Sequence, residues 1–247
     1  MTMNTSLARP TRPYIQPSRL LATAALLLGG VFASAAWALE PFSADYSARF
    51  MGMEADGKMT LENVGGNRWE YRMEAAGMGA RMIQSTTFEV EGDRWRPLSS
   101  EDSQIGESGL AAMLVRNKTV RATYDWDNNV ARWSGDVDDD EAGPVRLRPG
   151  DMDGMLINLA VIRDVAAGQP LEYRLVEDGR ARPQRFEVDG TETITVNGEE
   201  HEATRVVRTS GRREITAWIV DGMPAPARIL QKRNGRDHID LRLRSFN

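Results

Sequence analysis

The sequence predicts a mainly β protein, a curved antiparallel sheet or open β-barrel of about 10–12 strands with one amphipathic helix, about residues 152–166, packed on the inner face. Three observations predict this fold. Apolar and polar residues alternate along many segments, dipeptides suited to tight turns separate those segments, and one segment alone has helical spacing. Strands joined by short hairpins, together with one helix, account for all three observations.

Alternation begins in the segment 42–50. Every second residue of that segment is apolar, namely Phe42, Ala44, Tyr46, Ala48 and Phe50. Because a strand has a period of two, these side chains share one face of the sheet and the polar residues between them face water. The same pattern recurs in the segments 68–75, 120–126 and 239–244. Such half-buried strands are typical of antiparallel sheets, since parallel strands are buried on both faces and read as continuous apolar runs.

Turn dipeptides separate the alternating segments. Five of them tolerate positive φ, namely Gly65-Gly66, Asn128-Asn129, Asn197-Gly198, Asp221-Gly222 and Asn234-Gly235. They predict hairpins rather than long crossovers. No repeat of fixed period and no low-complexity linker interrupts residues 39–247. These residues are therefore expected to form one domain, a length that all-β domains often reach.

One segment departs from the strand pattern. Apolar residues follow each other at spacings of three and four at Met152, Met155, Leu156, Leu159, Ile162, Val165 and Ala166. This is the stripe of an amphipathic helix. Asp151 or Asp153 can cap its start, and Gly168 followed by Pro170 can end it. The stripe is expected to pack on the inward face of the sheet. Residues 77–84 are glycine-rich and receive no assignment.

The first 38 residues predict export. Arg9, Arg12 and Arg19 precede the uncharged run 20–38, which ends in Ala36-Trp37-Ala38. This pattern predicts a signal peptide cleaved after Ala38 and a periplasmic location. An uncleaved anchor is the alternative, since the run is almost long enough to span a bilayer. After cleavage no transmembrane segment is expected, and the absence of cysteine excludes both a lipid-acylated cysteine and disulfides.

The charge of the exported part disfavours nucleic acid. Without the three leader arginines it holds 28 basic residues against 36 acidic ones, a net charge of −8. A dispersed acidic surface attracts neither nucleic acid nor an anionic membrane. Basic pairs do occur at Arg212-Arg213 and Arg242/Arg244. Because they alternate with apolar residues, we interpret them as the solvated faces of strands.

No catalytic, cofactor-binding or metal-ligating residue is predicted. The two histidines, His201 and His238, lack the spacing of a zinc helix, although a site with an acidic third ligand stays open. The segment Gly106–Leu110 differs from a nucleophile elbow in its second glycine and is interpreted as a loop. The acidic run 136–141 matches only the first ligands of a calcium loop and is interpreted as an exposed hairpin loop. No cofactor is expected.

Aromatic residues leave two interpretations open. Trp69, Tyr71, Trp126, Trp133 and Trp218, with several methionines, could line an apolar cavity or simply form the core. The position of the helix 152–166 decides between them. A hollow interior would favour carriage of a ligand, and a packed one would favour a scaffold or interaction module.

The sequence resembles the DUF3108 family of exported bacterial proteins of unknown function. The residues that carry the resemblance are Phe42–Tyr46, Gly57–Met59, Lys118–Val120, Asp151–Met155, Ala217–Val220, Pro226–Ile229 and Leu241–Leu243. The resemblance implies a periplasmic β-rich domain and supplies no catalytic residues.

We expect a soluble periplasmic, non-enzymatic binding or envelope-associated module. Its partner would be an apolar or lipid-like envelope ligand or another envelope protein. The expected architecture is similar to the periplasmic lipoprotein-carrier fold, although architecture alone does not imply function. An unrecognised hydrolase and an outer-membrane β-barrel are the alternatives.

Overall fold

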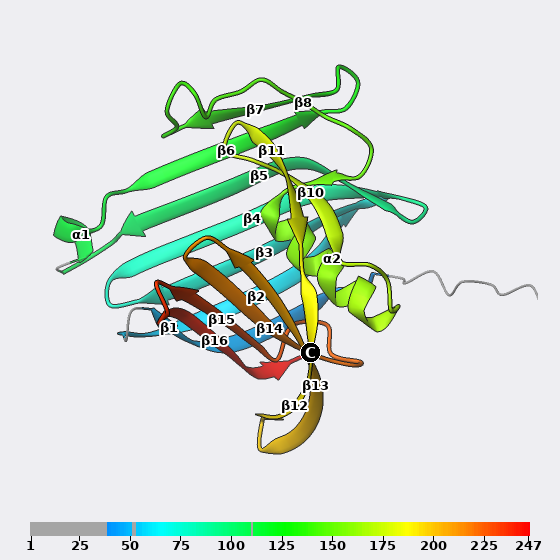
Figure 1. Cartoon of the computed structure of the whole chain (residues 1–247). Coiled ribbons are helices and arrows are strands. Elements are labelled where there is room, and N and C mark those ends of the chain that lie inside the picture. The colour runs from blue at the N-terminus through cyan, green and yellow to red at the C-terminus, as the bar shows by residue number, and fades with distance from the viewer. Residues whose placement is uncertain (1–38, 51–52, 110) are drawn as a thin grey trace, which may run out of the picture. The chain divides into compact units, whose positions relative to one another are not determined.

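One long antiparallel sheet dominates the structure (Figure 1). The computed structural model describes residues 39–50, 53–109 and 111–247, which belong to one compact unit. The predicted signal peptide, residues 1–38, lies outside the described residues. Thirteen strands pair in the order β12-β13-β14-β15-β16-β1-β2-β3-β4-β5-β6-β7-β8.

The strands of this sheet are β1 Phe42–Phe50, β2 Met53–Gly65, β3 Arg68–Gly77, β4 Ala80–Glu91, β5 Arg94–Gly106, β6 Lys118–Asp125, β7 Val130–Gly135, β8 Val145–Arg146, β12 Glu187–Val196, β13 Glu199–Ser210, β14 Arg213–Val220, β15 Arg228–Arg233 and β16 Arg236–Phe246. A second sheet has the order β11-β10-β9, with β9 Asp151–Met152, β10 Glu172–Glu177 and β11 Arg180–Arg185. The helices are α1 Ala111–Leu114 and α2 Gly154–Ala166.

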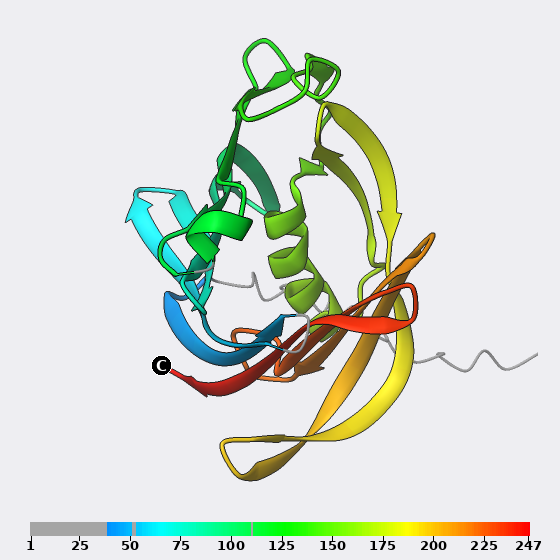
Figure 2. The ribbon, with the colours of Figure 1, turned by 90° about the vertical axis from the view of Figure 1, so that its left-hand side faces the viewer.

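The predicted fold class is confirmed. The protein is mainly β, the long sheet is curved and open, and a helix packs on its inner face (Figure 2). The long sheet has more strands than the 10–12 expected. Strand β8 has only two residues and shows no alternation, and the unassigned stretch 77–84 contains the start of β4.

The inner face of the sheet carries the core. Phe42, Ala44 and Tyr46 of β1 are buried there, as the alternation predicts. Tyr46 also donates a hydrogen bond of 2.8 Å from its hydroxyl to the carbonyl oxygen of Pro226. This bond ties the first strand to the connection between β14 and β15, so residues far apart in sequence close around one core.

Helix α2 starts at the aspartate that the sequence offered as a cap. Of the two candidates, Asp153 is the N-cap, and its Oδ1 accepts the backbone N–H of Leu156 at 2.8 Å. Asp151 lies instead in β9, where it pairs with Arg174. The helix ends before Gly168, which has a φ of +60°, as a glycine after a helix typically does.

The predicted turns lie between paired strands. Asn197 and Asn234, with φ values of 51° and 54°, begin the β12–β13 and β15–β16 turns. Both have left-handed conformations, which asparagine tolerates better than most residues. Among the described residues, no helix is long and apolar enough to cross a bilayer.

Candidate functional site

The space between α2 and the sheet is filled by side chains. Leu156, Ile157 and Leu159 of the helix have no exposed surface, and they share one cluster with the buried Tyr46 and Tyr71. Two recesses in the described part of the chain lie elsewhere and are lined mainly by polar residues. A ligand inside the core therefore has no support.

The aromatic residues that could have lined a cavity pack in cores instead. Tyr71 and Trp218 belong to the main cluster, and Trp69 packs against it. Trp133 belongs to a second cluster beside β10, against which Trp126 packs. Trp126 also donates from its ring nitrogen to the carbonyl oxygen of Pro97 at 2.7 Å.

Helix α2 is too short to cover the whole inner face. Its 13 residues extend about 20 Å, whereas a strand of 13 residues such as β5 extends about 40 Å. Figures 1 and 2 show α2 near one end of the long strands, inside the curve of the sheet. The other end carries the β3–β4, β13–β14 and β15–β16 turns; we call it the hairpin end.

Apolar residues continue toward the hairpin end, beyond the buried core. They share the inner face by register: Met82 pairs with Ala75, two residues after Met73, and Ile215 and Ile239 both pair with Gln231. All are half-buried rather than buried. We call these six apolar residues the uncovered inner face: Met73, Ala75, Met82, Val120, Ile215 and Ile239. The same register places polar side chains among them: Gln84, which donates to Asp102 at 2.9 Å, Gln104, and Gln231.

Two exposed methionines extend the apolar surface at the same end. Met78 lies in the β3–β4 turn and is 71% exposed, and Met113 lies in α1 and is 82% exposed. Helix α1 follows β5, whose last residue, Gly106, pairs with Ala80 beside that turn. Exposed large apolar side chains beside an apolar band are typical of a binding surface.

Two carboxyl groups lie at the start of α2. Burial raises the pKa of Asp153 to about 6, despite hydrogen bonds from the Leu156 N–H and the Thr86 hydroxyl, the latter at 2.7 Å. Burial, followed by the nearby Asp178 charge, raises the pKa of Glu177 to about 7. Such values suit acid–base chemistry. However, both oxygens of Asp153 accept structural hydrogen bonds, and Glu177 pairs with Arg182 at 2.8 Å.

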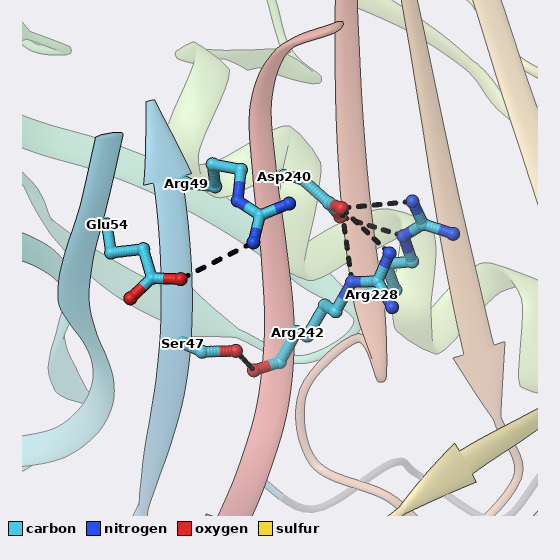
Figure 3. A network of polar contacts seen from close by, with 6 residues as sticks. All are labelled: Ser47, Arg49, Glu54, Arg228, Asp240 and Arg242. Atoms are coloured by element: carbon cyan, nitrogen blue, oxygen red, sulfur yellow. Dashed lines mark hydrogen bonds and ion pairs between the residues drawn. The ribbon is translucent and has the colours of Figure 1, made fainter. Parts of the chain in front are cut away.

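A polar recess of about 530 Å³ lies on the outer face of the sheet (Figure 3). Its charges pair with one another: Arg49 with Glu54 at 3.4 Å, and Arg242 with Asp240 at 3.0 Å. Arg228 binds Asp240 as well. Burial by itself would raise the pKa of Asp240, but these two arginines outweigh it and hold that pKa below its ordinary value. Because these charges neutralise one another, the recess attracts ions only weakly.

The other sequence candidates do not gather into one site, although His238 directly precedes Ile239 and the backbone N–H of Ser108 donates to the carbonyl oxygen of Gly79 in the β3–β4 turn at 3.1 Å. His201 is in β13, 4.0 Å from Glu199, and His238 is in β16. Ser108 lies in the loop before α1, and the acidic run 136–141 forms the connection between β7 and β8, where Asp140 pairs with Arg180. Within residues 39–50, 53–109 and 111–247, no three His, Asp or Glu side chains gather as a metal site would require.

The fold and the uncovered inner face define a class of protein: an open antiparallel half-barrel closed on one side by a capped helix. The family model described as "Protein of unknown function (DUF3108)" matches residues 45–234. The chain therefore belongs to the DUF3108 family, as the sequence motifs indicated.

The comparisons with solved structures and with curated proteins do not assign a function to this chain. The crystal structure of a β-barrel-like protein of the domain of unknown function DUF1849 from Brucella abortus is similar at 12% identity, with a TM-score of 0.43. The match covers 84% of this chain and 97% of that one. No curated protein matches the sequence.

Proposed function

We propose that this protein is a periplasmic, non-enzymatic binding module that holds the apolar chain of an amphiphile on the uncovered inner face. The observation that carries the proposal is the continuation of the apolar inner face beyond α2. The inner-face side chains there are half-buried rather than buried, and α2 lies near the other end of the strands. A protein that needed this face only for stability would gain by covering it.

The composition of the face suits an alkyl chain. Met73 and Met82 are flexible and polarisable, and they adapt to irregular apolar partners. Each methylene group removed from water contributes about 0.8 kcal/mol when fully buried. A chain of ten or so carbons on an open face, about half buried, would thus bind with micromolar to millimolar affinity. Weak binding of this kind suits reversible carriage.

The proposed location rests on residues 1–38, and mass measurement tests it. When the full chain is expressed in a Gram-negative host, we expect the osmotic-shock fraction to contain a protein that begins at Leu39. Intact mass spectrometry of that fraction gives the cleavage site directly. A full-length chain retained in the membrane fraction would instead support the anchor alternative.

Substitution of Met82 by glutamine tests the binding face. We expect the Kd for monomeric dodecyl maltoside, measured by isothermal titration calorimetry below the micelle concentration, to rise about fivefold, because one apolar contact is lost. Ile83→Gln is the matched control: this neighbour on β4 is also half-buried but points to the outer face. The proposal fails if wild type does not bind the detergent, or if both variants bind it equally well.

A further inference from the structure

Five arginines gather at two neighbouring turns of the hairpin end. The β13–β14 turn and its strands contribute Arg208, Arg212 and Arg213, and the β15–β16 turn contributes Arg233 and Arg236. Arg213 pairs directly with Arg233 across the sheet, and Arg233 pairs with Arg236. We call these five residues the arginine cluster.

None of these arginines has a carboxylate partner among the described residues. No Asp or Glu oxygen there lies within 4.0 Å of their guanidinium nitrogens. The nearby Glu214 is paired with Lys232 at 3.4 Å instead. This distinguishes the cluster from the outer recess, where the charges neutralise each other. The protein as a whole is acidic, with a net charge of −5, so a local excess of unpaired positive charge is unexpected.

The like charges of the arginine cluster destabilise the folded protein. Like charges directly opposite each other on antiparallel strands lie about 5 Å apart at Cβ and repel. Burial, followed by the positive charge of Arg182, lowers the pKa of Arg208; the negative charge of Glu177 opposes this shift and Arg213 adds to it. A recess of about 390 Å³ opens between the turns, lined by Ser210, Arg212, Arg213, Arg233 and Asn234. An anion in that recess would relieve the repulsion.

The arginine cluster continues the uncovered inner face. On β14, Arg213 is two residues from Ile215 and therefore on the same face, about 7 Å further toward the turn. Arg208 pairs with Ile215 itself. An apolar chain lying on Ile215 and Ile239 would thus bring its polar end to the arginines.

We propose that the arginine cluster binds the phosphate head group of the amphiphile whose chain lies on the uncovered inner face. This inference rests on the proposed function and names its ligand class, a phosphate-bearing amphiphile. Guanidinium groups form paired hydrogen bonds with phosphate oxygens, and two adjacent arginines provide donors on two sides. The Ser210 hydroxyl and the Asn234 amide add neutral donors to the same recess.

The double variant Arg213→Gln/Arg233→Gln tests this proposal. By titration calorimetry, we expect wild type to bind dodecyl phosphate about tenfold more tightly than dodecyl maltoside, as one charge-assisted contact would give. The variant should lose this preference and keep the wild-type affinity for dodecyl maltoside. Arg68→Gln/Arg94→Gln is the matched control, since both residues are exposed, lie in other hairpins and also lack a carboxylate partner among the described residues.

Several outcomes separate this inference from the proposed function. Unchanged binding of dodecyl phosphate to the double variant would overturn the arginine site. Binding of dodecyl maltoside without any preference for the phosphate would overturn it too, while leaving the apolar face supported. If inorganic phosphate and dodecyl phosphate bound equally well, both through Arg213 and Arg233, the arginine site would be supported as an anion site and the apolar-chain function would be overturned.

The stability of the free double variant provides an independent readout. Because the substitution removes repulsion, the melting temperature without ligand should equal or exceed that of wild type at low ionic strength. A melting temperature several degrees below wild type would assign the arginines a structural role and contradict a binding role.

Discussion

Replacing Leu159 with alanine is expected to lower the free energy of unfolding by about 4 kcal/mol. Leu159 is in the middle of α2 and has no exposed surface. Its neighbours belong to two packed layers, the helix stripe and the sheet, so they can move little to fill the space. The loss therefore includes both the transfer of the removed atoms and the cavity that they leave. Urea unfolding followed by circular dichroism measures it.

Asn158→Ala is the control for this prediction. Asn158 precedes Leu159 in the same helix but is exposed, and alanine has the higher helix propensity, so its stability should be unchanged or slightly increased. A cost well below 2 kcal/mol for Leu159→Ala would contradict a filled interior, since a side chain beside a hollow space leaves little new cavity. That result would restore the core as a ligand site and weaken the case for the uncovered inner face.

Most of the fold could be predicted because its causes are local. Alternation in 42–50 depends only on the strand period, and the helix stripe with its Asp153 cap depends on the helix period and on one side chain. The sequence could not choose between Asp151 and Asp153, since either can precede the stripe. Pairing of Asp151 with Arg174 settles that choice, and Arg174 is 23 residues away.

The candidate site could not be predicted, because its causes are not local. The sequence pattern predicts solvated strand faces for Arg212-Arg213 and for Arg242; all three are exposed, but only Arg242 has a carboxylate partner among the described residues, Asp240. The difference is the register that places Arg233 opposite Arg213, which no local pattern specifies. Equally, the alternation marks Met82 as inward-facing, but only the position of α2 decides which inward-facing residues stay uncovered. The one local signal is an excess of arginine over acid in the β13–β14 and β15–β16 turns, which the β14–β15 connection separates in the sequence.

The stability of the protein is expected to fall as the pH rises from about 4 to about 7. The pKa of Asp153 is 3.8 in a solvated chain and about 6 in the fold, so between these values the folded protein binds the proton more tightly. Stability from this group is therefore fully present below pH 4 and decreases by roughly 3 kcal/mol as the pH passes 6. Glu177, whose pKa is raised to about 7, acts in the same direction. Asp240, with its lowered pKa, acts only below pH 4 and cannot offset the fall.

Asp153→Asn isolates the contribution of Asp153 to this slope. Asparagine caps helices as well as aspartate does and still offers an oxygen to the Leu156 N–H, but it has no proton to lose. Urea titrations between pH 4.5 and 8 should show the variant equal to wild type at the acid end and more stable at the alkaline end, by up to about 3 kcal/mol. If the free energy of unfolding of the variant changed with pH as steeply as that of wild type, Asp153 would not be the group that titrates. A variant less stable at every pH would show instead that the carboxylate is needed as a charged cap, and that its hydrogen bonds to Thr86 and Leu156 outweigh the cost of burying it.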